Sequence, residues 1–233
     1  MQYFGGKSRI AADIAAIIKA NSTSRLIYEP FCGGCSVTVA LANAGFKVEA
    51  SDYNEYVIAM WQEAMQGRVM PYTITEDDYK AAKTTEDKAL RGFVGHACSY
   101  GSRWFGGYAR GCVDYAFTGS QSVYKKVERM KDKTSFHHRS YTEVNPDRGS
   151  AIYCDPPYCA TVNGYNAQFD NEAFNRFLES NWIDCDVYVS EFYSPGDSFK
   201  RVASFPLKAK LSSRGTGDKQ NEDNLYFRPA RNH

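Results

Sequence analysis

The sequence contains no long apolar run. Its 233 residues are 43% hydrophobic and 24% charged, the balance of an ordinary globular protein. No segment approaches the roughly 20 consecutive apolar residues of a membrane-spanning helix. The N-terminal stretch IAADIAAIIKA is amphipathic and does not resemble a signal peptide. We therefore expect a soluble protein that makes no contact with a membrane.

The cysteines lack the spacing of a disulfide framework. There are seven of them, an odd number, which favours a reducing compartment such as the cytoplasm. Cys32 and Cys35 form a CxxC pair, but a second CxxC and a suitably spaced histidine pair are both missing. We expect no metal, with a structural zinc site at this pair as the less favoured alternative.

A large net charge of either sign is also absent, since 28 Lys and Arg nearly balance 27 Asp and Glu. The distribution is uneven. Residues 89–148 contain ten Lys and Arg against five acidic residues, so this segment carries +5 while the whole chain carries +1. Such asymmetry indicates that one part of the molecule meets a polyanion. A solvated basic face without a partner is the alternative.

Internal repeats and low-complexity tracts are missing as well. The apolar periodicity predicts a helix over residues 8–20, a strand over 25–29, a helix over 36–44, a strand over 46–51 and a helix around 57–64. This order of strands and helices is typical of a parallel sheet with right-handed crossovers.

The pattern breaks between residues 67 and 148, where helical pieces and polar loops replace it. We expect helices to start near Thr75 and Thr85, and a basic helix over residues 122–133. Later segments predict strands over 151–154 and 186–191, a helix around Phe174, and a hairpin from 205–211 and 224–229. The sequence therefore predicts one α/β domain, residues 1–66 and 149–233, interrupted by a mostly helical insertion, residues 67–148.

The first predicted strand leads into a glycine turn, YEPFCGGCS, at residues 28–36. It lacks the GxGxxG spacing of a dinucleotide-binding loop, which disfavours a nicotinamide oxidoreductase. Glu29 precedes the turn and would attract a cation, while Asp52 ends the second strand, where such sheets offer a carboxylate to ribose hydroxyls. S-adenosylmethionine, an adenosine with an ammonium and a sulfonium, fits both features. A structural turn beside a strand-end aspartate is the alternative.

A rigid motif follows the later predicted strand, in the stretch AIYCDPPYC at residues 151–159. Two consecutive prolines end a strand and stiffen the tip that carries Asp155 and Tyr158. The tip belongs at the carboxyl edge of the sheet, where ligands of such folds bind.

The motifs FGGK, EPFCGG, SDYN and DPPY, in this order, resemble the D12-class (alpha-group) DNA N6-adenine methyltransferases of bacteria and phages. The resemblance covers residues 3–66 and 150–228 and is weaker across the insertion. It implies a Rossmann-like methyltransferase fold, S-adenosyl-L-methionine as methyl donor, no metal, and site-specific action on double-stranded DNA. It also implies a target-recognition role for the insertion and a place in the cytoplasm of a bacterium or phage-infected host. We expect a monomer, with a dimer on DNA as the alternative.

The resemblance further implies which residues form the cofactor pocket. They are Tyr3, Gly6, Lys7, Glu29, Phe31, Gly33, Asp52 and Asp155. Tyr3 and Lys7 would border the methionine end of the cofactor, and Asp52 would hold the ribose. The family's turn usually reads F-x-G-x-G, whereas Cys35 stands here at the second glycine, a departure that bears on cofactor affinity.

Asp155, Pro156 and Tyr158 are the catalytic residues that the resemblance implies. Adenine N6 is a poor nucleophile because its lone pair is delocalised into the ring. Asp155 and the carbonyl of Pro156 would each accept one N6 hydrogen and stabilise the positive charge that develops on nitrogen. Tyr158 would stack on the base and hold it in position. In duplex DNA the adenine must first be flipped out of the helix.

The insertion contains SYGSRWFGGYARG at residues 99–111, in which aromatic side chains interleave with arginines. Arginine contacts guanine edges or phosphates, and aromatic rings stack on or between bases. We expect DNA contacts from Tyr100, Arg103, Trp104, Tyr108, Arg110, Lys125 and Lys126, with the lysines on phosphates. A glycine-rich loop whose aromatics pack into the domain is the alternative, and His137 and His138 are expected to be surface residues.

Other functions stay open at this point. Methyltransferases acting on cytosine N4 tend to carry Ser or Thr where this chain has Asp155, which argues against that activity but does not exclude it. Methylation of RNA is a further alternative. A nucleic-acid-binding protein that has lost catalysis through Cys35 is the alternative from another class.

Overall fold

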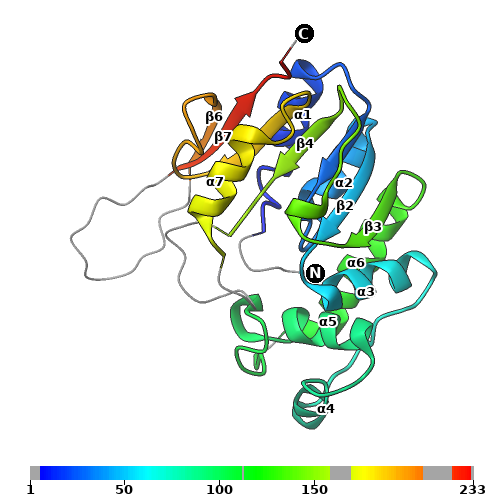
Figure 1. Ribbon diagram of the computed structural model, residues 1–233. Helices are drawn as coiled ribbons and strands as arrows, with labels where there is room; N and C mark the ends of the chain where they lie inside the picture. The colour runs from blue at the N-terminus through cyan, green and yellow to red at the C-terminus, as the bar shows by residue number, and fades with distance from the viewer. Residues whose placement is uncertain (1–5, 112, 158–168, 207–221, 232–233) are drawn as a thin grey trace.

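Within residues 6–111, 113–157, 169–206 and 222–231, which the computed structural model describes, seven strands form one mixed sheet (Figure 1). The strands are β1 Leu26–Glu29, β2 Lys47–Asp52, β3 Thr134–His138, β4 Ala151–Cys154, β5 Asp186–Glu191, β6 Lys200–Pro206 and β7 Glu222–Arg228. Their order is β3-β2-β1-β4-β5-β7-β6, parallel through β5, with β7 antiparallel to both of its neighbours. The expected Rossmann-like α/β fold is confirmed.

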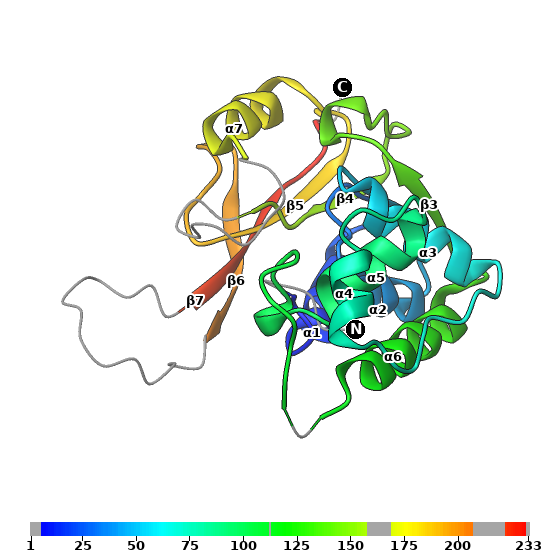
Figure 2. The ribbon, with the colours of Figure 1, turned by 90° about the horizontal axis from the view of Figure 1, so that it is seen from below.

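Helices cover both faces of this sheet (Figure 2). The α-helices are α1 Ala11–Asn21, α2 Ser36–Ala44, α3 Glu55–Met65, α4 Glu76–Ala81, α5 Lys88–Ala97, α6 Tyr115–Met130 and α7 Asn171–Ser180. One hydrophobic core lies between the sheet and α1, α2 and α3, and a second lies under α7 on the opposite face. Neighbouring strand residues point to opposite faces, so Ile27 belongs to the first core and Tyr28 to the second.

The helical part of the insertion packs against α3. Phe93 and Val94 of α5 share the hydrophobic core of Trp61 on α3. Gly92 permits the close approach of the two helices, because a Cβ there would lie 2.1 Å from the carbonyl oxygen of Tyr56. The insertion is therefore continuous with the core of the sheet domain.

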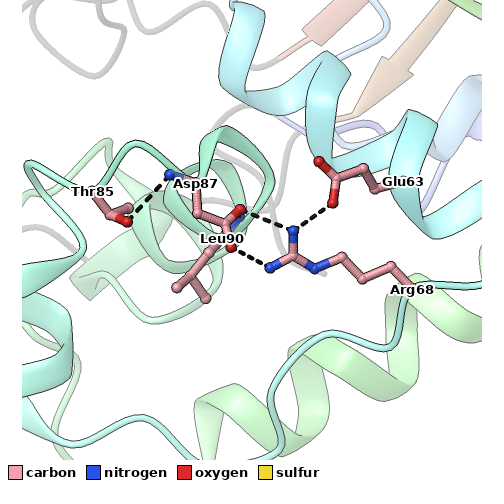
Figure 3. A network of polar contacts seen from close by, with 5 residues as sticks. All are labelled: Glu63, Arg68, Thr85, Asp87 and Leu90. Carbon is pink, nitrogen blue, oxygen red and sulfur yellow. Dashed lines mark hydrogen bonds and ion pairs between the residues drawn. The ribbon is translucent and has the colours of Figure 1, made fainter.

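A polar network secures the same junction (Figure 3). The Arg68 guanidinium donates to Glu63 on α3 and to both carboxylate oxygens of Asp87, with Nη1 2.9 Å from Oδ1. Asp87 is the N-cap of α5 and accepts the Leu90 amide at 2.9 Å. The capping residue is thus Asp87 rather than the expected Thr85, whose hydroxyl accepts the Asp87 amide instead.

Three elements differ from expectation. β3 lies inside residues 67–148 yet pairs with β2 at the edge of the sheet, and Phe136 is its buried apolar side chain. Helix α6 starts at Tyr115, seven residues earlier than expected, because Asp114 caps it by accepting the Phe117 amide. β6 begins at Lys200 rather than at residue 205. No helix in the part of the chain described is long and apolar enough to cross a membrane.

Candidate active site

A cavity of about 720 Å³ opens at the carboxyl ends of β1, β2 and β4. These strands are neighbours in the sheet, so the polar residues that end them or follow them meet at one edge. Glu29, Asp52 and Asp155 all line the cavity, although they lie far apart in the sequence. The three carboxylates that the sequence singled out therefore belong to a single site.

The glycine turn forms one wall of this cavity, and backbone geometry holds it in place. Gly33 has a positive φ of 42°, and Cys35, directly before α2, has a φ of 54° in the left-handed region. The Gly33 amide donates to Oδ2 of Asp52 at 2.9 Å, and its carbonyl accepts the indole N–H of Trp61 at 2.9 Å. Cys35 thus adopts the backbone conformation that glycine most readily supplies.

The Asp52 carboxylate is oriented by backbone donors on both sides. Besides the Gly33 amide, it accepts the Asn54 amide at 2.9 Å through Oδ1. Asn54 in turn caps α3 by accepting the amides of Tyr56 and Val57. Asp52 therefore joins the glycine turn to the start of α3 and presents its carboxylate at the cavity wall.

Glu29 is the most deeply buried acid of the cavity, with 2% of its surface exposed. Its Oε2 has no hydrogen-bond partner among the residues described. Burial raises the pKa of this carboxyl to about 8. A buried polar atom without a partner is costly, so the site favours a ligand that offers Glu29 a donor or a positive charge.

Lys7 also lines the cavity and bridges two carboxylates. Its Nζ is 2.7 Å from Oδ1 of Asp155 and 3.4 Å from Oδ2 of Asp223. Burial lowers the pKa of Lys7, but the charges of Asp155 and Asp223 outweigh it, so the pKa lies above its usual value. Lys7 was expected to border the cofactor; its ion pair with the DPPY acid was not.

Glu191, the last residue of β5, adds another acid at the same edge. It is buried and accepts the Phe192 amide at 2.7 Å through Oε1. Burial raises the pKa of Glu191 to about 7, and the nearby Asp155 and Asp223 act in the same direction. Glu191 belongs to the stretch YVSEFYSP, residues 188–195.

Aromatic rings line the side of the cavity towards α7. Phe31 stacks on Tyr141 with ring centroids 5.7 Å apart, and it meets Phe169 and Phe174 edge to face. Phe31 was expected here from the turn motif. Tyr141 and Phe169 also line the cavity, and sequence reasoning missed Tyr141 because no local motif connects it to the turn.

The cavity continues towards the insertion. Tyr56 and His96 line it, and Trp104 contacts both of their rings. The Trp104 ring stacks on Tyr56 with centroids 5.5 Å apart and lies tilted against His96 with centroids 5.0 Å apart. Burial lowers the pKa of His96 to about 4. The exposed Tyr53, next to Asp52 in SDYN, also borders the opening.

The candidate DNA contacts of the insertion fall into two groups. Tyr100, Arg103, Arg110 and Lys125 are exposed, and Arg110 forms an ion pair with Glu76. Trp104 and Tyr108 are half-buried, and the Tyr108 hydroxyl donates to the Ile74 carbonyl at 2.7 Å. The two rings therefore pack into the protein, Trp104 against Tyr56 of α3 and His96 of α5, as the alternative interpretation of the loop anticipated.

Lys126 was expected to contact a DNA phosphate, but its side chain points to the glycine turn. Its ammonium donates to the Gly34 carbonyl and to the Ser36 hydroxyl, the latter at 3.3 Å. Desolvation by burial lowers the pKa of Lys126. This lysine on α6 therefore braces the glycine turn.

Gly6 and Pro156, also expected at the site, lie at or beside the cavity. Gly6 lines the cavity, and Pro156 is buried directly after Asp155. Tyr3 and Tyr158 lie outside the residues described. Cys32 and Cys35 are free, buried thiols, and no group of three or more His, Cys, Asp or Glu able to hold a metal occurs in the described ranges.

Three solved structures are similar to this chain. An rRNA methyltransferase, aviRa, from Streptomyces viridochromogenes shares 12% identity over 97% of this chain and 85% of that one, with a TM-score of 0.44. A putative methyltransferase, yhhF, from Escherichia coli shares 10% identity over 96% and 87%, with a TM-score of 0.44. Magnesium protoporphyrin IX methyltransferase from Synechocystis PCC 6803, with bound SAM, shares 10% identity over 95% and 79%, with a TM-score of 0.43. No curated protein sequence matches the chain.

A family model matches the N-terminal part of the chain. The matched residues, 3–93, include the motifs FGGK, EPFCGG and SDYN, and with them Lys7, Glu29 and Asp52. This confirms the resemblance for these three motifs, while DPPY lies outside the matched residues. Over residues 3–93 the chain matches the D12 class N6 adenine-specific DNA methyltransferases, which supports a DNA adenine methyltransferase as its enzyme class.

Proposed function

We propose that the protein transfers a methyl group from S-adenosyl-L-methionine to the N6 amino group of adenine in DNA, at specific sites and with the base flipped out of the helix. The observation that carries the proposal is the convergence of Glu29, Asp52 and Asp155 on one cavity beside the glycine turn. The first two suit the cofactor, and the third suits the base.

The residues present fit the cofactor. Glu29 offers a buried carboxylate oxygen without a partner, which suits a cationic group such as the ammonium. Asp52 presents an oriented carboxylate at the end of β2, which suits ribose hydroxyls. When bound, S-adenosyl-L-methionine supplies an electrophilic methyl group, and no metal is needed for the transfer.

Asp155 and Pro156 would act on the amino group. The Asp155 carboxylate and the Pro156 carbonyl each accept one N6 hydrogen, which directs the nitrogen lone pair out of the plane of the base. Glu29 and Asp52 would hold the cofactor, which would supply the methyl group to N6 and keep the carbon–sulfur bonding electrons on its sulfur. The N6 proton then passes through Asp155 to solvent. Acceptors fixed before the reaction stabilise the developing charge without reorganising, and Tyr158 stacks on the base.

The exposed part of the insertion would bind the DNA. Tyr100, Arg103 and Arg110 lie on the segment that carries Trp104, and Trp104 contacts the cavity residues Tyr56 and His96. DNA held on this segment would therefore lie beside the cavity that receives the flipped base. Lys125 would add a phosphate contact.

A transfer assay with a radiolabelled methyl donor tests the proposal. Duplex DNA should gain label as N6-methyladenine. Label found in RNA, or in DNA as N4-methylcytosine, would support the alternative methyltransferases instead. Calorimetric titration with S-adenosyl-L-methionine distinguishes a methyltransferase from a protein that only binds nucleic acid, because the latter would give no binding heat. The absence of both binding heat and methyl transfer would overturn the proposed function.

A further inference from the structure

Asp223 reaches the active-site edge because β7 runs against the direction of the strands before it. The register pairs Asn224 with Glu191, the last residue of β5, so Asp223 lies just beyond that carboxyl end. Its carboxylate is buried and lies 3.4 Å from Nζ of Lys7. No sequence motif pointed to Asp223, and it falls outside the residues that match the family model.

Lys7 therefore stands between two carboxylates from opposite parts of the chain. The side chains of Lys7, Asp155 and Asp223 are 8%, 19% and 6% exposed, so the cluster is largely withdrawn from solvent. At 2.7 Å, the Lys7 ammonium fixes one oxygen of Asp155. Asp223 limits where that ammonium can lie, because its Oδ2 lies 3.4 Å from the same Nζ.

We propose that Asp223 is a positioning residue for the methyl-transfer step, holding Lys7 so that Lys7 orients Asp155. The inference rests on the proposed function, because it concerns the acid that binds the N6 amino group. It assigns a role in catalysis to β7, the antiparallel strand that lies between β5 and β6.

The test is a double-mutant cycle between Asp223 and Lys7 with kcat, KM and cofactor affinity measured separately. Asp223→Asn should lower kcat on the order of tenfold, less than the loss typical of a group that touches the reacting atoms, with cofactor Kd and the melting temperature nearly unchanged. Asp223→Glu, which keeps the charge, should recover part of the activity.

In the Lys7→Met background the same Asp223→Asn change should cost nothing or improve kcat, because it then removes repulsion between two carboxylates. Glu222→Gln is the matched control, an exposed acid on the same strand whose side chain contacts Ser204. It should leave kcat unchanged.

Equal losses from Asp223→Asn in both backgrounds, or no loss in the wild-type background, would overturn the inference while leaving the proposed function standing. If Asp223→Asn is too unstable to assay, the Asp223→Glu pair of measurements in the two backgrounds decides instead: a loss of the same size with and without Lys7 overturns the inference. A wild-type protein without methyl-transfer activity would overturn the proposed function itself.

Discussion

The ammonium group of Lys126 on α6 donates a hydrogen bond to the carbonyl oxygen of Gly34, in the turn that leads from β1 into α2. The contact joins the insertion to the part of the cavity that would hold the cofactor. The same turn contains Cys35, which occupies a left-handed backbone conformation without being glycine. Lys126 thus supports the turn at the point where the chain departs from the family's glycine pattern.

Lys126→Met should therefore weaken the binding of S-adenosyl-L-methionine. The substitution keeps an apolar stem of similar length but removes the donor to Gly34 and Ser36. Hydrogen bonds from charged groups contribute about 1.5–3 kcal/mol, and since this one acts through the turn, we expect a loss of about three- to tenfold. Isothermal titration calorimetry measures it. Lys131→Met, an exposed lysine at the end of α6, is the control, and equal affinities for the two variants would refute the bracing role.

Glu29→Gln should change how stability depends on pH in the absence of cofactor. The pKa of Glu29 is raised to about 8 in the folded protein, from an ordinary value near 4.5, so the folded state disfavours the carboxylate. Its contribution to stability is fully present below pH about 4.5 and is lost as the pH rises through about 8. The melting temperature of the variant should therefore rise relative to that of the wild type as the pH increases from 6 to 9.

Differential scanning fluorimetry across this pH range checks the prediction. Glu128→Gln is the control, since Glu128 is an exposed acid on α6 that pairs with Lys131. A constant difference in melting temperature between wild type and Glu29→Gln at all pH values would show that Glu29 does not titrate as described.

Gly92→Ala should loosen the junction between the insertion and the sheet domain. A Cβ at this position would lie 2.1 Å from the Tyr56 carbonyl oxygen, and backbone cannot yield as a side chain can. Overpacking of this kind costs about 1–3 kcal/mol, measurable by urea denaturation. At Gly111 an added Cβ would meet Tyr115 no closer than 3.8 Å, so Gly111→Ala should change stability by less than about 0.5 kcal/mol. Similar effects at both glycines would contradict the packing argument.

Arg103→Ala should weaken DNA binding without affecting cofactor binding. Arg103 is exposed on the aromatic segment next to Trp104. If it contacts a phosphate, the slope of log affinity against log salt should fall by about one, and if it contacts a base, discrimination should fall by about 1–3 kcal/mol. Arg176→Ala on α7 provides the comparison, because α7 covers the opposite face of the sheet. Unchanged binding across a salt series would remove Arg103 from the DNA surface.

The parts of the site that the sequence predicted are those in which local chemistry determines position. The glycine turn, the strand-end carboxylates and the DPPY tip each follow a short buried strand, and the parallel sheet brings such ends to one edge. The strand β3 was not predicted because it lies at the edge of the sheet and buries a single residue, Phe136, so its sequence shows no apolar run.

Long-range pairings could not be predicted. Lys7 meets Asp223 only because β7 is antiparallel, and Lys126 meets Gly34 only because α6 packs on α2. Basic residues on a helix look alike in sequence whether they face solvent or a turn carbonyl. Lys125 and Lys126 illustrate this, since the first is exposed and the second points inwards.

Asp155 is proposed to bind the amino group of adenine for methyl transfer. The most direct test of this role is sequencing, with detection of N6-methyladenine, of DNA from cells that express either the wild-type protein or the Asp155→Ala variant. The wild type should place N6-methyladenine within one short recurring sequence, and the variant should place none while remaining folded. Equal methylation by both proteins would contradict the mechanism, and methylation of cytosine would contradict the assigned base.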